Sequence, residues 1–167
     1  MNKKEIVLAG GCFWGTEKYV SLISGVLETE AGYANGKTEN PSYEQVCYEG
    51  TGHAEAVKVV YDEDRISLKR LLELFFESIN PTTLNRQGND TGSQYRSGIY
   101  CLNDEDMRTA EAELAQLQKK YDKKVVVELM RLQNYYKAEE YHQKYLDKHP
   151  FGYCHISPSV MKIASES

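Results

Sequence analysis

The hydrophobic and polar positions of the chain follow a strand-like period in some segments and a helix-like period in others. Residues 4–9 include an apolar run that two glycines end, and residues 26–33 and 53–62 alternate with a period of two. Each of these three segments predicts a strand. Residues 67–79 carry apolar side chains at helical spacing, which predicts a helix capped by Ser67. Similar patterns predict helices over 12–24, 104–121 and 137–148 and strands over 96–102 and 125–130.

Two long segments between these elements lack a hydrophobic period. Residues 33–52 and 80–95 are rich in turn-forming residues and predict loops, and loops of this length are usually functional or disordered. Residues from His149 to the end are rich in Pro, Gly and Ser and predict a long C-terminal coil. We expect one domain, 1–167, in which strands and helices alternate around one sheet, so the pattern predicts an α/β-like or α+β fold.

Composition excludes several classes of protein. The net charge is -5, and lysines and arginines are interleaved with acids, so no basic patch for nucleic acid is expected. No apolar stretch approaches the roughly 20 residues that cross a bilayer, and the run 6–9 is too short for the core of a signal peptide. The four cysteines are scattered, with no CxxC pair, which predicts a reducing compartment, most simply the cytoplasm.

The segment "GGCFWG" places Cys12 at the predicted junction of a strand, two glycines and a helix. The first turn of a helix offers free N–H groups that stabilise a thiolate, so this position suits a nucleophile with a lowered pKa. The alternative is a buried, inert cysteine. Phe13 and Trp14 are consecutive and cannot both face the core of a helix, so at least one should border an open site.

A second candidate lies on the predicted strand "GHAEAVKVV". Glu55 shares a strand face with Val57 and Val59, which predicts that its carboxyl group points into the core. Burial there would raise its pKa and make it a general acid, whereas the alternative is a buried glutamate satisfied by hydrogen bonds. His53 is either a base or, as we expect, a packed histidine.

The loops and the tail carry further polar candidates. The glycine-rich loop 80–95 holds Asp90 and Tyr95, and loop 33–52 holds Tyr43. Cys47 and Cys101 lie beside apolar or strand positions and are expected to be structural. Cys154 lies in the flexible tail, where it could meet a partner thiol or be incidental. A zinc site is not expected, because the histidines and cysteine near the end match no zinc spacing; they are His142, His149, Cys154 and His155.

Four motifs in order resemble one family over nearly the whole chain. "GCFWG", "GHAEAV", "RQGNDTGSQYRS" and "GYC" are similar to the A-type peptide-methionine sulfoxide reductases. The stretch "GYANG" departs from the expected "GYxGG" at Asn35, but asparagine tolerates positive φ. The resemblance implies an α+β fold with a mixed sheet and flanking helices, which we expect to contain a ferredoxin-like βαβ core. It implies no metal or organic cofactor, and we expect a monomer.

The resemblance also implies a mechanism. Cys12 would attack the sulfur of methionine (S)-sulfoxide, free or in proteins, while Glu55 protonates the oxygen. The resulting sulfenic acid would condense with Cys154, in the tail 149–167, to a disulfide that thioredoxin reduces. The substrate-binding residues implied by the motifs, two for the methyl group and three for the oxygen region, are Phe13, Trp14, Tyr43, Asp90 and Tyr95.

Three rival functions are open at this point. A cysteine hydrolase would use Cys12 and His53 and would need no reductant. A zinc deaminase would use the "HAE" segment, but the P-C-x-x-C half of that signature is absent. A non-enzymatic thioredoxin-binding module would form no sulfenic acid.

Overall fold

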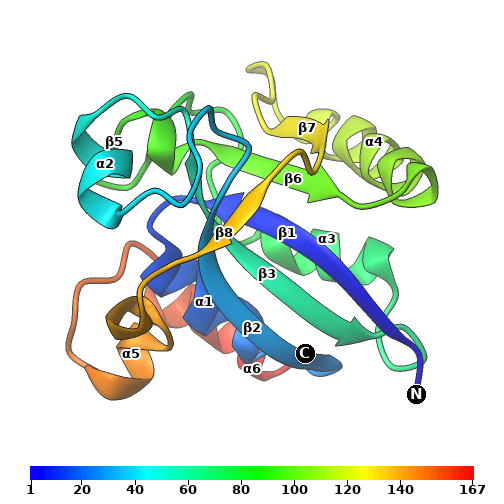
Figure 1. Ribbon diagram of the computed structural model, residues 1–167. Coiled ribbons are helices and arrows are strands. Elements are labelled where there is room, and N and C mark those ends of the chain that lie inside the picture. Colours follow the sequence, from blue (N-terminus) through cyan, green and yellow to red (C-terminus); the bar gives the residue numbers. More distant parts are fainter.

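The computed structural model describes residues 1–167 and is built on a mixed sheet of six strands (Figure 1). The strand order is β7-β6-β1-β3-β2-β8. All neighbours are antiparallel except β6 and β7, which are parallel. The strands are β1 (Lys3–Gly10), β2 (Val26–Ala34), β3 (Ala54–Asp62), β6 (Ser97–Cys101), β7 (Glu128–Arg131) and β8 (Tyr135–Lys137).

Four helices cover one face of this sheet, the far side in Figure 1. Ser67 caps α3 as predicted, because its hydroxyl accepts a hydrogen bond from the backbone N–H of Arg70. The main hydrophobic core lies between these helices and the sheet, where alternate residues of β3 such as Val57 and Val59 meet the leucines of α3. The four helices are α1 (Phe13–Ser21), α3 (Leu68–Phe76), α4 (Asp104–Gln118) and α6 (Pro158–Ser165).

The opposite face of the sheet is covered by an extended segment of the chain and not by helices. Small side chains dominate the strands on this face, and the segment that leads into β8 packs over them. Two residues of that segment, Leu132 and Tyr135, contact the small-residue cluster. The register of β2 with β3 pairs Tyr33 with Glu55 and Ala31 with Val57. Glu55 therefore lies on the helix-covered face, at the end of β3 nearest α1.

The two segments predicted as loops contain short regular elements. Within 33–52, Tyr43–Tyr48 form α2, and Ser42 and Gln45 form a reciprocal capping box at its start. Within 80–95, Arg86–Gln87 (β4) and Asp90–Thr91 (β5) form a two-stranded hairpin. The expectation of plain loops was therefore too coarse, since these elements are too short to show a hydrophobic period.

The predicted helix over 137–148 is wrong for most of its length. Its first residue belongs to β8, and only Tyr145–Lys148 (α5) is α-helical. Lys144 adopts a left-handed conformation with φ 51°, which breaks the helix. The Gln143 side chain bonds to the backbone N–H and carbonyl of Ala31, so this stretch follows the edge of β2 instead.

The predicted C-terminal coil is also wrong over its second half. Residues 158–165 form α6, which Ser157 caps through the backbone N–H of Val160 and which begins with Pro158. The helix packs against the core through Ala164. Residues 149–157 remain irregular and connect α5 to α6.

Candidate active site

Cys12 occupies the N-cap position of α1, where β1 ends and the chain turns through Gly11 at φ 93°. Its side chain is almost fully buried, with 7% of its surface exposed. Burial raises the pKa of the thiol well above its usual range, and the charge of Glu55 raises it further. The backbone N–H groups of Trp14 and Gly15 act in the opposite direction. The predicted lowering of the pKa is therefore wrong for the free protein, because the loss of water outweighs the helix N-terminus.

Glu55 lies on β3 with no exposed surface, as the strand pattern predicted. Its Oε1 accepts a hydrogen bond of 3.2 Å from the backbone N–H of Phe13, and its Oε2 has no partner. Burial raises the pKa of this carboxyl group to about 8. Glu55 is therefore protonated at neutral pH. Its carboxyl group is bonded to the amide of Phe13, which is the residue after Cys12. In that protonated state its charge no longer opposes ionisation of the thiol.

The two aromatic side chains after Cys12 point to different environments. Phe13 is buried, with its ring tilted against Tyr33 at 5.7 Å between centroids. Trp14 is half-buried and stacks on Tyr145 at 3.7 Å and 8°. Its indole Nε1–H donates to Nδ1 of His142 at 2.9 Å. Trp14 is thus the one of the pair that is partly exposed, in agreement with the argument from helix geometry.

The residues that hold Trp14 belong to a segment that we call the strap, residues 139–148. Glu139 accepts hydrogen bonds from the hydroxyl of Tyr33 and from the backbone N–H of Tyr43. Farther along, Glu17 of α1 accepts one from the backbone N–H of Lys144 at 2.7 Å. Gln143 of the strap also bonds to Ala31 of β2. Together these contacts fix the strap across the end of the sheet beside α1.

His142 is a site residue that the sequence argument missed, because it considered this histidine only as a metal ligand. Its ring is buried between Phe13, Trp14 and Tyr43, and burial lowers its pKa, which keeps the ring neutral at neutral pH. The polar residues that interrupt the helical pattern of the strap were a sign in the sequence that this segment has contacts beyond a helix. Their contacts could not be found from periodicity, since they join segments more than 100 residues apart in the chain.

The three predicted oxygen-binding residues surround the same region. Burial raises the pKa of Tyr43 and of Tyr95, and the charge of Glu55 adds to both shifts. Both phenols therefore keep their protons at neutral pH and remain hydrogen-bond donors. Asp90 lies on the β4–β5 hairpin, where its Oδ2 accepts a hydrogen bond of 2.9 Å from the hydroxyl of Tyr153. Tyr153 was not among the site residues predicted from the sequence.

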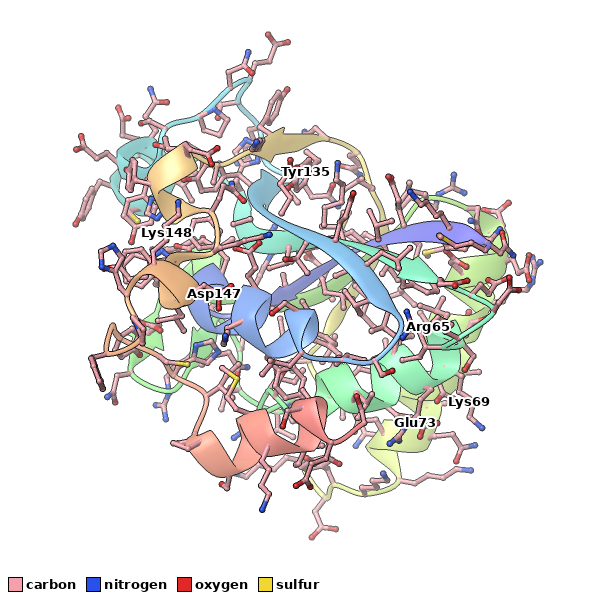
Figure 2. The ribbon with its side chains drawn as sticks, turned by 90° about the horizontal axis from the view of Figure 1, so that it is seen from below. Arg65, Lys69, Glu73, Tyr135, Asp147 and Lys148 are labelled. Atoms are coloured by element: carbon pink, nitrogen blue, oxygen red, sulfur yellow. The ribbon has the colours of Figure 1, made fainter.

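Cys154 lies beside α1 although it is far from Cys12 in sequence. A Cβ atom added to Gly15 would stand 3.2 Å from its Sγ, so the sulfur packs one helical turn from Cys12. All four cysteines are free thiols. Figure 2 shows how the chain reaches this place: α5, which carries Asp147 and Lys148, lies beside α1, and the chain continues below α1 into α6.

The other two cysteines and His53 lie apart from this arrangement or at its edge. Cys101 is buried on β6, as expected of a structural residue, whereas Cys47 is half-buried near the hydroxyl of Tyr43. His53 is bonded through Nε2 to the carbonyl oxygen of Thr38 at 2.7 Å, and burial lowers its pKa. His53, which would be the base of a cysteine hydrolase, is therefore bonded to the turn at residues 36–38.

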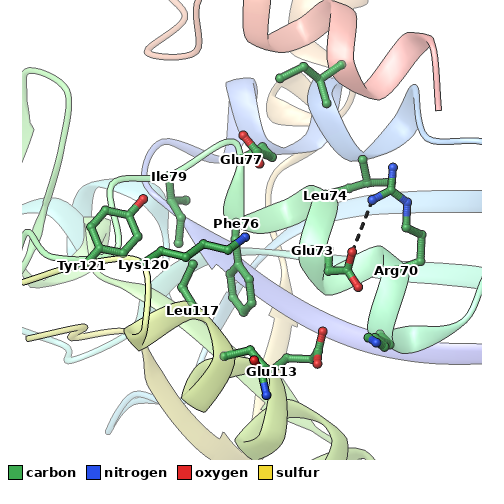
Figure 3. Close-up of a pocket in the computed structure, with 13 residues that line it drawn as sticks. Arg70, Glu73, Leu74, Phe76, Glu77, Ile79, Glu113, Leu117, Lys120 and Tyr121 are labelled. Carbon is green, nitrogen blue, oxygen red and sulfur yellow. Dashed lines mark hydrogen bonds and ion pairs between the residues drawn. The ribbon is translucent and has the colours of Figure 1, made fainter.

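One cavity lies away from the motif residues, and a second includes Cys154 in its lining. A cavity of about 670 Å³ lies between α3 and α4 and contains the ion pair of Arg70 with Glu73 (Figure 3). A smaller one of about 410 Å³ is lined by Cys154 and by apolar residues around Pro150 and Met161. No group of three or more His, Cys, Asp or Glu side chains is arranged to hold a metal ion. The helices are all too short or too polar to span a bilayer.

Known proteins are similar to this chain in sequence and in structure. The family model described as Peptide methionine sulfoxide reductase matches residues 4–166. The peptide methionine sulfoxide reductase MsrA of Lachnoclostridium phytofermentans is 56% identical over 167 residues, which cover 100% of both chains. The reduced form of Mxr1 from Saccharomyces cerevisiae superposes with a TM-score of 0.87 at 40% identity and covers 92% of this chain and 89% of that one.

A further solved structure contains a second protein. It is Mxr1 from Saccharomyces cerevisiae in complex with Trx2, which matches with a TM-score of 0.63 at 29% identity over 86% of this chain and 85% of that one. The family model spans nearly the whole chain, and the relatives match over nearly their full lengths. The chain therefore belongs to the peptide methionine sulfoxide reductase family, in the MsrA group of enzymes that reduce methionine sulfoxide to methionine.

Proposed function

We propose that Cys12 is the nucleophile and Glu55 the proton donor of this reductase, acting on the S-epimer of methionine sulfoxide. A bond forms between Cys12 Sγ and the substrate sulfur while Glu55 protonates the sulfoxide oxygen. The oxygen then passes to Cys12 as a sulfenic acid, methionine leaves, and the proton lost by the thiol replaces the one that Glu55 gave. The observation that carries this proposal is the fully buried Glu55 carboxyl group, which accepts a hydrogen bond from the Phe13 amide next to Cys12 and whose pKa burial raises to about 8.

The aromatic residues and the phenols divide the substrate between them. Phe13 and Trp14 form an apolar corner for the methyl group, and the Tyr43 and Tyr95 hydroxyls donate hydrogen bonds to the oxygen. Asp90 supports this region from the hairpin, through its bond with Tyr153. Free methionine sulfoxide and methionine sulfoxide in proteins both present the same methyl, sulfur and oxygen to these groups, so both are expected substrates.

Regeneration of the enzyme uses Cys154. Its thiol attacks Cys12 Sγ, the S–S bond forms, the S–O bond breaks, and water leaves with the thiol proton. A thioredoxin dithiol then reduces the Cys12–Cys154 disulfide and becomes a disulfide itself. The position of Cys154 Sγ against Gly15 supports this assignment, and a relative has been solved in complex with Trx2.

The experiment that tests this function uses one equivalent of each sulfoxide epimer and the reduced protein. We expect the S-epimer to release one equivalent of methionine and to convert Cys12 and Cys154 to a disulfide, with Cys47 and Cys101 left as thiols. A hydrolase that used Cys12 and His53 would instead cleave an ester or amide without losing any thiol. A disulfide of Cys12 with Cys47, or no loss of thiols, would contradict the proposal.

We also infer the topology of the core, the number of domains, the compartment and the oligomeric state. The order β6-β1-β3-β2, with α1 and α3 as crossovers, is the basis for assigning a ferredoxin-like βαβ core. The whole chain, 1–167, is assigned to one domain, because α6 and β1 contribute to the same core. The free thiols suit a reducing compartment such as the cytoplasm, and a monomer is the simplest state consistent with a site built from one chain.

A further inference from the structure

We propose that His155 is a positioning residue that holds Cys154 next to Cys12 for the second step of the reaction. The proposal rests on the function assigned to Cys154 above. We call the His155 side chain and its contacts with the Cys12 turn the latch. Nothing in the motif "GYC" includes this histidine, and the first step of the mechanism does not use it.

The first observation is a hydrogen bond between the tail and the turn that carries the nucleophile. His155 Nε2 lies 2.8 Å from the carbonyl oxygen of Gly10, two residues before Cys12. A carbonyl oxygen can only accept, so Nε2 carries a hydrogen. Burial lowers the pKa of His155 and keeps the ring neutral at neutral pH, so Nδ1 carries none. Nδ1 is buried and has no partner. The ring is therefore fixed by one donated bond, at the point where β1 ends.

The second observation is that three glycines make the space for this ring. A Cβ atom would stand 3.0 Å from Nε2 if added to Gly11, 3.1 Å from Nδ1 if added to Gly15, and 3.2 Å from the His155 Cβ if added to Gly88. These glycines come from the strand–helix turn, from α1 and from the β4–β5 turn. Any side chain at one of them would press on the histidine.

Gly15 is the informative member of the three. Gly11 and Gly88 have positive φ, so their backbone conformation alone favours glycine. Gly15 is helical and needs no such conformation, and alanine would suit a helix better. What its missing side chain provides is room for two neighbours, the His155 ring at 3.1 Å and Cys154 Sγ at 3.2 Å. The last glycine of "GCFWG" thus marks the place where the tail docks.

The third observation is a second tether on the other side of the cysteine. Tyr153 donates its hydroxyl hydrogen to Asp90 on the hairpin, and His155 bonds to Gly10. Cys154 is held between these two contacts within the irregular segment 149–157. Such fixation raises the effective concentration of one thiol at the other, and that concentration sets the rate of an intramolecular disulfide step.

The test separates the two steps in a single turnover with methionine (S)-sulfoxide. In His155→Ala, methionine should be released at the parent rate, while formation of the Cys12–Cys154 disulfide should slow by about tenfold or more, as expected for loss of orientation. Dimedone should then trap a sulfenic acid on Cys12. His155→Gln, whose amide can donate to Gly10, should recover part of the rate of the second step. Phe151→Ala, which removes a fully exposed side chain of the same segment, is the control and should behave as the parent.

Gly15→Ala provides a second variant, in which His155 itself is not substituted. Its methyl group would press on the ring and on the sulfur, while alanine favours the helix, so the ratio of disulfide formation to methionine release should fall without a lower melting temperature. Disulfide formation at the parent rate in His155→Ala would overturn the latch, and so would an equal slowing of both steps. If the parent itself forms no Cys12–Cys154 disulfide, the assignment of Cys154 fails instead.

Discussion

At the residue scale, the site depends on one buried carboxyl group that keeps its proton. Glu55 is a poor choice for the core of a sheet, because its ionised form would lie in an apolar environment with a single amide donor. Burial resolves this conflict by raising the pKa to about 8. The same feature that makes Glu55 costly at high pH leaves it, at neutral pH, with the proton that the proposed mechanism uses.

Glu55→Gln tests the role of this proton. Glutamine preserves the acceptor for the Phe13 amide but cannot deliver a proton to the sulfoxide oxygen. Methionine release in a single turnover should slow by about 10²–10⁴-fold, the usual contribution of general acid catalysis. The subsequent disulfide step should change little. Release at the parent rate across neutral pH would remove Glu55 from the mechanism.

The same variant should change the pH dependence of stability. In the folded protein the carboxyl group holds its proton up to about pH 8, whereas in the unfolded chain it ionises near 4.5. Between these values the native state binds more protons, so this group lowers the free energy of unfolding as pH rises, by up to about 1.4 kcal/mol per pH unit. Glu55→Gln should therefore be more stable than the parent at pH 8 and similar to it near pH 4. Thermal unfolding at both pH values measures this, and a parallel loss of stability in the two proteins would contradict it.

At the scale of elements, the strap explains how Trp14 is held. Glu17, Gln143 and the left-handed Lys144 attach residues 139–148 to α1 and β2, and the strap in turn presents His142 and Tyr145 to the indole ring. None of these contacts is local in the sequence. The proposed wall for the substrate methyl group is thus assembled from both ends of the chain.

Gln143→Ala is expected to loosen the strap. The backbone N–H of Ala31 and the carbonyl of Ala138 would lose this partner, while the carbonyl of Ala31 keeps the N–H of Ala138. A buried group left unsatisfied typically costs about 1–3 kcal/mol. Trp14 is the single tryptophan, so its fluorescence reports directly on this change and should shift to longer wavelength. The KM for methionine sulfoxide should rise more than kcat falls.

Glu17→Gln serves as the control for the strap, because its amide oxygen can still accept from the Lys144 N–H. It should retain the parent fluorescence and KM. An unchanged fluorescence in Gln143→Ala would mean that Trp14 is held without the strap.

The elements that the sequence predicted correctly are those with local causes. The alternation in β2 and β3, the apolar stripe of α3 and the Ser67 cap all act within a few residues. The helix predicted over 137–148 does not form because Gln143 takes part in long-range hydrogen bonds that override the helical pattern. Likewise, the position of Cys12 at a helix start was predicted, but its raised pKa was not, since burial depends on the whole fold.

At the scale of the whole molecule, the sheet brings four distant segments to one end. The β1–α1 turn supplies Cys12, β3 supplies Glu55, the strap supplies His142, and the tail supplies Cys154. The tail crosses below α1 before α6 anchors it to the core (Figure 2). Motifs in the sequence identified Cys12, Glu55 and Cys154, whereas the place of His142 in the site, the latch and the strap appear only in three dimensions.

Cys154→Ser should separate repair from recycling. The first turnover should still release one equivalent of methionine, because the proposed chemistry at sulfur needs no thiol other than Cys12. Thioredoxin attacks disulfides and should then support turnover poorly, while a small thiol can still reduce the sulfenic acid. Steady-state rates with each reductant measure this, and full thioredoxin-dependent activity would show that another cysteine resolves the intermediate.

The most direct measurement of the central claim is the mass of the Cys12 peptide from Cys154→Ser protein after one equivalent of methionine (S)-sulfoxide and dimedone. The account predicts a single dimedone adduct on Cys12, equal in amount to the methionine released, and no adduct with the R-epimer. Methionine release without an adduct on Cys12, or an adduct on Cys47 or Cys101, would contradict it.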